Sequence, residues 1–224
     1  LRGVPTITDV DYMAELLRRL GVDVQRDGDT VKVDVPGHVS HAAPYHLVRR
    51  LRASIAVLGP LIARCGAADV ALPGGDAIGS RGLNMHLAGL AKFGATVRVE
   101  HGFVLARAPE GLRGASVWLD FPSVGATENL VTAATLAAGE SVIDNVAREP
   151  EIVDICRMLV DMGAKIDGIG TSTLRVEGVE RLHPTEHTVV SDRIVTGTWA
   201  VAAVMTQGDI TIVGGRADHL EIVL

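Results

Sequence analysis

A glycine-rich segment, residues 72–86, differs from the apolar stretches around it and is the first place where chemistry is expected. Its sequence, LPGGDAIGSRGLNMH, has four glycines and one proline in fifteen residues. This composition predicts a loop whose backbone N–H groups can approach a ligand closely. Asp76 and Arg81 lie in it, and a helix begins near Asn84. We interpret the segment either as an anion-binding loop with an acid at its tip, or as a connecting loop in which Asp76 caps a turn.

Three helix starts carry further residues that could bind an anion, at equivalent places along the chain. Arg52 comes one turn before an apolar helix and has the small Ala53 and Ser54 beside it, so its guanidinium could reach a phosphate or a carboxylate. The corresponding residues before the next two helices are Ser123, Val124 and Gly125, and then Asp192, Arg193 and Thr196. If the three helix starts converge, they favour a phosphate-rich ligand. Helix capping, and snorkelling by Arg52, are the alternative explanations.

The elements that must hold these residues repeat along the chain. Amphipathic helices are expected to end at Gly21, Gly94 and Gly163, and helices that are apolar nearly all round at Gly66, Gly139 and Gly208. The two glycines of each pair are 45 residues apart, and successive pairs are displaced by 73 and 69 residues. Two short strands with a turn follow each amphipathic helix. The spacing predicts three units, at about residues 9–72, 82–145 and 150–214.

Three such units predict one α/β domain over residues 1–214 with pseudo-threefold symmetry. We expect the apolar helices inside, and the sheets and amphipathic helices outside. Aromatic residues make up only 3% of the chain, in keeping with small side chains that let central helices approach closely. Residues 215–224 resemble the opening of a fourth unit and are expected to start the crossing into a second domain.

Composition and charge exclude several classes of partner. The 224 residues are 47% hydrophobic, which argues against disorder, and carry a net charge of −6 without a lysine-arginine run. We therefore expect no nucleic-acid partner and no membrane partner. The longest apolar run, residues 53–63, is too short to cross a bilayer, and no signal peptide is visible. Cys65 and Cys156, in apolar stretches, fit inert core thiols in a cytoplasmic protein. No metal-binding or cofactor motif is found.

Six stretches of the sequence resemble the enolpyruvyl transferase family, in particular its members that act on UDP-N-acetylglucosamine: residues 52–61, 72–86, 121–129, 147–154, 178–182 and 191–198. The resemblance implies an inside-out α/β barrel of three βαβαββ-type repeats, one of two such domains. It also implies transfer of the enolpyruvyl group of phosphoenolpyruvate to the 3′-hydroxyl of the sugar, with release of phosphate, the first committed step of peptidoglycan synthesis. Because the family's active site lies between its two domains, we expect this chain alone to be inactive.

The resemblance also implies which residues form the site. Arg52 and Arg81 match arginines that hold the phosphate and carboxylate of phosphoenolpyruvate. Asp76 matches the loop residue that donates a proton to the vinyl carbon. The nucleotide sugar is expected to contact Gly82, Leu83, Asn84, Met85 and His86, and its diphosphate Ser123, Val124 and Gly125. Gly82 and Asn84 depart from the proline and aspartate that are usual in the family.

Position 76 has a chemical consequence of its own. Most members of the family have cysteine there and some have aspartate, as this chain does. The antibiotic fosfomycin alkylates the cysteine, because a thiolate is a strong nucleophile and a carboxylate a poor one. The sequence therefore predicts resistance to fosfomycin.

Two other functions remain open at the level of sequence. One is the related transfer of enolpyruvate to phosphoshikimate, although the glycine-rich GNAGTA motif of those enzymes has no equivalent here. The other is a non-catalytic module that binds a nucleotide sugar. Turnover separates this module from an enzyme, because a binder would hold UDP-N-acetylglucosamine without releasing phosphate.

Overall fold

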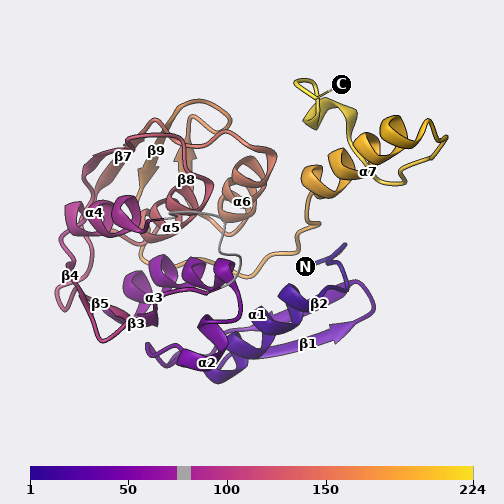
Figure 1. The fold of residues 1–224 in the computed structure, drawn as a ribbon. Helices are drawn as coiled ribbons and strands as arrows, with labels where there is room; N and C mark the ends of the chain where they lie inside the picture. The colour runs from indigo at the N-terminus through magenta and orange to yellow at the C-terminus, as the bar shows by residue number, and fades with distance from the viewer. Residues whose placement is uncertain (75–81, 224) are drawn as a thin grey trace.

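The computed structural model describes residues 1–74 and 82–223, and it shows a mixed α/β chain in which one order of elements recurs (Figure 1). The first unit contains α1 (Thr8–Arg19), β1 (Asp23–Asp27), β2 (Thr30–Asp34), α2 (Tyr45–Val48), the 3-10 helix η1 (Arg52–Val57), α3 (Leu58–Cys65) and β3 (Ala67–Ala71). The second contains α4 (Asn84–Lys92), β4 (Thr96–Glu100), β5 (Phe103–Arg107), β6 (Ser116–Trp118), α5 (Val124–Ala134) and β7 (Glu140–Asp144). The third contains α6 (Pro150–Asp161), β8 (Lys165–Asp167), β9 (Thr173–Glu177), α7 (Arg193–Thr206) and η2 (Ala217–His219).

The strand that ends one unit pairs with the hairpin of the next. The first sheet is the hairpin β1–β2, the second has the order β3–β5–β4, and the third has the order β6–β7–β9–β8. β3 pairs antiparallel with β5, with Val70 opposite Val104, and β7 pairs antiparallel with β9, with Ile143 opposite Leu174. All four of these side chains are buried. The repeated units are thus joined through shared sheets.

The core lies around α3 and α5, which pack against each other between the sheets (Figure 1). Leu58 and Ile62 of α3 and Leu130 of α5 are fully buried. Small residues allow the close approach, because a Cβ placed on Gly59 would lie 2.2 Å from the backbone oxygen of Asn129. The predicted buried helices with small residues at their contacts are confirmed for α3 and α5.

Gly59→Ala is therefore expected to destabilise the chain by about 3 kcal/mol, since the methyl group meets the α5 backbone rather than a movable side chain. Alanine favours a helix over glycine by only about 1 kcal/mol, so the steric clash decides the sign. Urea unfolding measures the effect. Gly37→Ala is the control, because a Cβ there meets nothing within 4 Å. Equal unfolding midpoints for the two variants would contradict the close packing.

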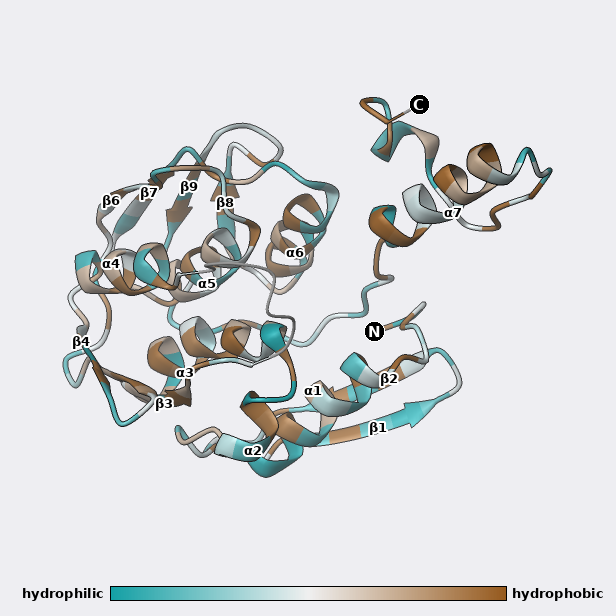
Figure 2. Cartoon of the chain, in the orientation of Figure 1, coloured by the Kyte–Doolittle hydropathy of each residue, from teal (hydrophilic) through white to brown (hydrophobic). Residues whose placement is uncertain are grey.

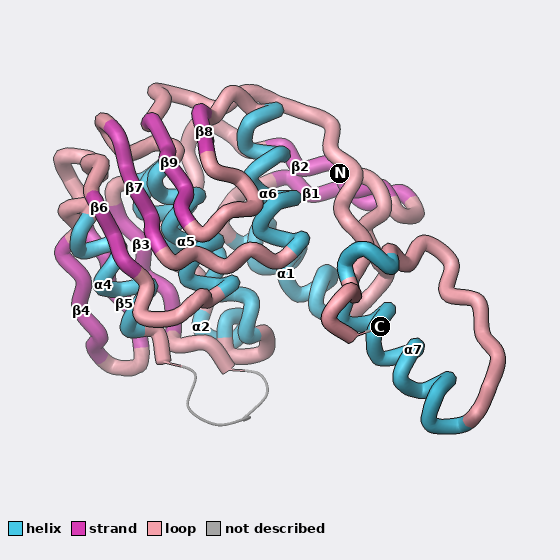
Figure 3. Tube along the Cα trace, turned by 90° about the horizontal axis from the view of Figure 1, so that it is seen from above, coloured by secondary structure: helices cyan, strands magenta, loops and turns pink. Residues whose placement is uncertain are grey.

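The third apolar helix departs from the prediction. α7 forms, but it has no buried residue and lies beyond the sheets at one end of the molecule (Figures 1 and 3), with Trp199 58% and Met205 80% exposed. The predicted strand after it is missing from the described residues, and the left-handed residue that ends the helix is Gln207, not Gly208.

The physical reason is that an apolar helix becomes buried only where another surface covers it. α3 and α5 cover each other, whereas the contacts of α7 within the described chain are few. Its first residue, Arg193, forms an ion pair with Glu151 of α6, and Leu220 lies against Gly197. In Figure 2, several turns of α7 have the brown colour of hydrophobic residues. The expectation that all three apolar helices are buried is met by two of them.

No helix among the described residues has both the length and the apolar character that a membrane crossing requires.

Candidate functional site

A cavity of about 930 Å³ lies where the first two units meet. It is lined from α1, the segment before η1, η1 itself, the start of α4 and the start of α5: Asp9, Arg50, Leu51, Arg52, Ala53, Ile55, Ala56, Gly82, Asn84, Met85, His86, Phe121, Ser123, Val124, Gly125 and Glu128. Eight of the residues predicted from the sequence are in this set: Arg52, Gly82, Asn84, Met85, His86, Ser123, Val124 and Gly125. Residues more than seventy positions apart in the chain therefore face one volume.

One predicted residue, Leu83, lies elsewhere: its side chain belongs to the hydrophobic core, with 9% of its surface exposed. Two further predicted residues, Asp76 and Arg81, lie outside the described residues.

The start of α5 supplies backbone donors to the cavity. Ser123 is the N-cap residue, and its hydroxyl accepts a hydrogen bond from the N–H of Ala126 at 3.3 Å. The first N–H groups of a helix have no partner within the helix, and the helix dipole favours negative charge at this end. Gly125 lies against His86, since a Cβ on Gly125 would be 3.4 Å from the ring carbon Cε1. This end of the cavity is suited to an anion.

His86 is a neutral group in this site. It comes from α4 and only 5% of its surface is exposed. Burial, and then the positive charge of Arg52, lower the pKa of His86 to about 4. Its Nδ1 atom lies 3.0 Å from the Nδ2 atom of Asn129, a fully buried residue of α5.

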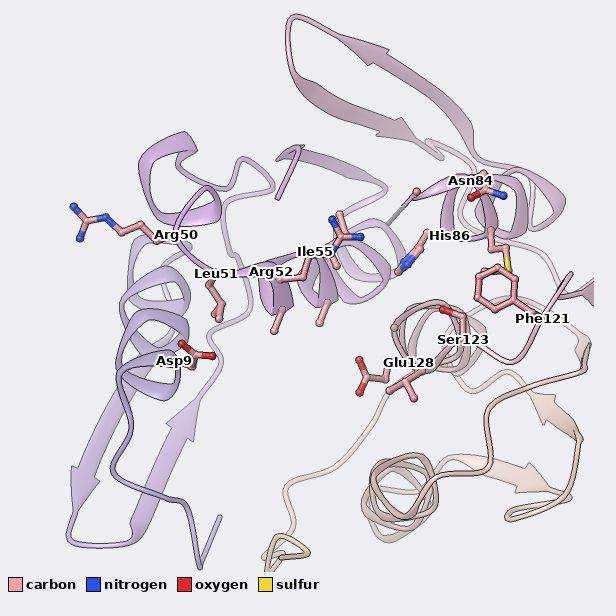
Figure 4. A pocket seen from close by; sticks show the side chains of 16 residues that line it. Asp9, Arg50, Leu51, Arg52, Ile55, Asn84, His86, Phe121, Ser123 and Glu128 are labelled. Atoms are coloured by element: carbon pink, nitrogen blue, oxygen red, sulfur yellow. The ribbon is translucent and has the colours of Figure 1, made fainter. Parts of the chain in front are cut away.

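Charged groups face the cavity from two sides. Figure 4 shows the guanidinium of Arg52 beside the ring of His86, with the Glu128 carboxyl of α5 facing the same space, while Arg50 points away. Burial, and then the charge of Glu151, raise the pKa of Glu128 to about 7. An arginine, a neutral histidine and a helix N-terminus in one cavity can bind phosphate or carboxylate groups.

The raised pKa of Glu128 predicts a dependence of stability on pH. Between pH 4.5 and about 7 the folded state binds more protons at this carboxyl than the unfolded state does, so its contribution to stability is present at low pH and is lost as pH rises through this range. Glu128→Gln removes the ionisation. We expect the variant to unfold like the wild type near pH 4, and to be more stable by about 1–3 kcal/mol at pH 8.

Urea unfolding of both proteins at the two pH values measures this difference. Glu110→Gln is the control, because Glu110 is exposed in the turn after β5 and does not line the cavity. A Glu128→Gln difference that is the same at pH 4 and pH 8 would show that the environment of Glu128 does not penalise its charge.

The start of α7 does not take part in the cavity. The carboxylate of Asp192 accepts hydrogen bonds from the N–H groups of Ile194 and Val195, at 2.7 and 3.1 Å, and the guanidinium of Arg193 binds Glu151. These residues cap the helix and anchor it to α6. The expected convergence of three helix starts is therefore wrong for the third, where the capping explanation holds.

Sequence reasoning missed Glu128 and Asn129 as parts of the site. Both lie at the end of the stretch 121–129 that resembles the family, and each is a polar residue in a mostly apolar helix. A buried polar residue requires a partner or a function, and this signal could have drawn attention to them.

Comparison with known proteins gives consistent results. The family model described as EPSP synthase (3-phosphoshikimate 1-carboxyvinyltransferase) matches residues 1–224. This chain is 60% identical over 224 residues to a protein named UDP-N-acetylglucosamine 1-carboxyvinyltransferase from Corynebacterium jeikeium, and 55% identical over 224 residues to one of the same name from Mycobacterium tuberculosis. Each alignment covers 100% of this chain and 53% of the relative, so the chain spans about half the length of these curated relatives.

Solved structures agree on the fold. The enolpyruvyl transferase NikO from Streptomyces tendae has a TM-score of 0.76 at 24% identity. The alignment covers 89% of this chain and 48% of the NikO chain. An EPSP synthase from Acinetobacter baumannii has a TM-score of 0.65 at 20% identity, over 86% of this chain and 44% of its own. The predicted fold class is confirmed by these likenesses.

Proposed function

Because this chain belongs to the EPSP synthase (3-phosphoshikimate 1-carboxyvinyltransferase) family along all 224 residues, we propose that it forms one wall of an active site that transfers the enolpyruvyl group of phosphoenolpyruvate to the 3′-hydroxyl of UDP-N-acetylglucosamine. The observation that carries the proposal is the cavity in which Arg52, His86 and the start of α5 face one volume. The choice of UDP-N-acetylglucosamine over phosphoshikimate is supported by the names of relatives that are 51–60% identical. The product would enter peptidoglycan synthesis.

The reaction proceeds by addition and then elimination. In the addition, the sugar oxygen bonds to C2 of phosphoenolpyruvate while C3 takes up a proton, and the hydroxyl proton is lost. In the elimination, C3 gives up a proton and the C2–O bond to phosphate breaks, which restores the double bond and releases phosphate. We assign the proton donor to Asp76, from the resemblance of its segment to the family. This residue lies outside the described part of the chain.

The remaining residues of the site bind and orient the two substrates. Arg52 holds an anionic group of phosphoenolpyruvate, and its fixed guanidinium stabilises the negative charge that develops during addition. Arg81 is assigned the same role by resemblance. The N–H groups at the start of α5 hold the diphosphate of the nucleotide, and residues 82–86 contact its uridine and sugar. A second wall, which the remaining length of the relatives would provide, excludes water and completes the set of binding groups.

Phosphate release tests the proposal. Phosphoenolpyruvate and UDP-N-acetylglucosamine are supplied to the chain alone, and to the chain joined to the remaining part of the Corynebacterium jeikeium relative. We refer to the joined form as the completed protein. Release is expected only from the completed protein. If it binds UDP-N-acetylglucosamine but releases no phosphate, the proposal is wrong and the chain is a nucleotide-sugar-binding module. Release from phosphoshikimate instead would point to the related enzyme.

A further inference from the structure

A buried amide at the back of the cavity has a fixed orientation. Asn129 is fully buried on α5, and its Oδ1 atom accepts the backbone N–H of Gly59 at 2.7 Å, while its Nδ2 atom donates to the carbonyl of Ile55 at 3.1 Å. A backbone N–H can only donate and a carbonyl oxygen can only accept. These two contacts therefore determine which end of the amide is oxygen and which is nitrogen.

The orientation of the amide determines the protonation of its neighbour. The Nδ2 atom lies 3.0 Å from Nδ1 of His86. An amide nitrogen donates and has no lone pair to accept with, so Nδ1 must be the acceptor and carry no proton. A longer contact of Nδ2 to the carbonyl of Gly125, at 3.4 Å, does not change this requirement. In the neutral ring the proton is then on Nε2.

We propose that Asn129 is a positioning residue, which holds His86 in the Nε2–H form so that a neutral hydrogen-bond donor faces the anion bound at the start of α5. The place of Nε2 supports this, because a Cβ on Gly125 would lie 3.7 Å from it. Among the described residues, the charged groups that line the cavity are Asp9, Arg50, Arg52 and Glu128. The low pKa of His86, about 4, agrees with a ring that stays neutral at physiological pH.

The ligand that fits is a phosphate group, and this part of the inference rests on the proposed function. A phosphate oxygen accepts hydrogen bonds, so it is attracted by Nε2–H and repelled by the lone pair that the other tautomer would place there. The group could come from the diphosphate of UDP-N-acetylglucosamine or from phosphoenolpyruvate. Titrating the two ligands separately distinguishes these sources.

The tautomer is tested first, in the 224-residue chain without ligand. Nitrogen NMR of ¹⁵N-histidine-labelled protein distinguishes a protonated ring nitrogen from an unprotonated one, and the spectrum of His86→Gln identifies the signals of His86. We expect a proton on Nε2 and none on Nδ1 in the wild type. A proton on Nδ1 would overturn the inference, and this measurement needs no folded variant at position 129.

The substitution Asn129→Asp then exchanges donor and acceptor between residue 129 and Nδ1 of His86. The aspartate has the same shape, so one oxygen keeps the Gly59 N–H, while the other faces Nδ1 of His86 as an acceptor. We expect a proton on Nδ1 in this variant, a change that loss of stability alone would not produce. Thr135→Val is the matched control, because Thr135 is a buried polar residue at the far end of α5, and its hydroxyl donates to Thr132. It should leave the His86 signals unchanged.

Ligand binding is measured on the completed protein, with wild-type and variant residues at position 129. Calorimetric titration is expected to show about tenfold or greater weakening by Asn129→Asp for the ligand whose phosphate meets His86, and no weakening by Thr135→Val. Equal affinity of wild type and Asn129→Asp for both ligands would overturn the role of His86 as a donor. If the wild type binds neither ligand, the proposed function fails, and the ring nitrogens still decide whether Asn129 sets the tautomer.

Discussion

Fosfomycin is expected to leave phosphate release by the completed protein unchanged, and to abolish it once Asp76 is replaced by cysteine. The antibiotic forms a covalent bond with a nucleophile, and a thiolate is a far stronger nucleophile than a carboxylate. Asp76→Cys introduces the cysteine that most members of the enolpyruvyl transferase family acting on UDP-N-acetylglucosamine have in this loop. Phosphate release after incubation with fosfomycin, and the intact mass of each protein, measure the effect.

The chain's own cysteines are the internal controls for this experiment. Cys156 is fully buried, and burial raises the pKa of its thiol to about 11. Burial also raises the pKa of the Cys65 thiol, partly offset by the charge of Arg64. Both groups remain protonated at neutral pH and are expected to stay unmodified, so peptide mapping should place the adduct on position 76. An adduct on Asp76, or inhibition of the unmodified protein, would refute the prediction.

The repeat could be predicted from the sequence because glycine positions are set by local backbone geometry. Gly21, Gly94 and Gly163, expected to end helices, all have positive φ angles, between 92° and 98°. A left-handed residue at the end of a helix strongly favours glycine wherever the helix lies in the fold. Local geometry of this kind needs no knowledge of tertiary contacts.

The burial of α7 could not be predicted in the same way. Its sequence is as apolar as that of α5, and both helices form. Hydrophobicity shows that a helix favours burial, but the partner that buries it is a property of the tertiary structure. α5 packs against α3 and α6, whereas Val204 of α7 is 79% exposed. A prediction from repeat symmetry assumes an equivalent partner in every unit, and within the described residues α7 has no partner that covers it as α3 covers α5.

The residues of the cavity also differ in how far the sequence alone could identify them. Arg52, His86 and Ser123 could be identified because they belong to stretches with recognisable sequences, and the fold then brings them together. Asn129 belongs to one of those stretches too, but its role depends on hydrogen bonds to Gly59 and Ile55, seventy or more residues away. Contacts over such separations leave no local pattern in one sequence.

Replacing Arg52 is expected to have the largest effect among substitutions of the described residues on the activity of the completed protein. Arg52→Lys should lower kcat/KM for phosphoenolpyruvate about a hundredfold, and Arg52→Ala about a thousandfold or more. Lysine keeps the positive charge, but it cannot form the paired hydrogen bonds that a planar guanidinium makes to two oxygens. Steady-state phosphate release at varied phosphoenolpyruvate measures both variants. Arg98→Lys is the control, because Arg98 lies on β4 with its side chain exposed and does not line the cavity, and it should change the rate by less than about twofold.

A second measurement separates the charge of Arg52 from its shape. The positive charge contributes to the low pKa of His86, so Arg52→Ala should raise that pKa, while Arg52→Lys should leave it low. Titration of the His86 ring by NMR in the 224-residue chain shows this without any turnover. If Arg52→Ala loses activity and raises the pKa of His86, while Arg52→Lys loses activity with the pKa unchanged, the guanidinium geometry is required for catalysis. Activity of Arg52→Ala within about twofold of the wild type would instead mean that the reacting anions are held elsewhere.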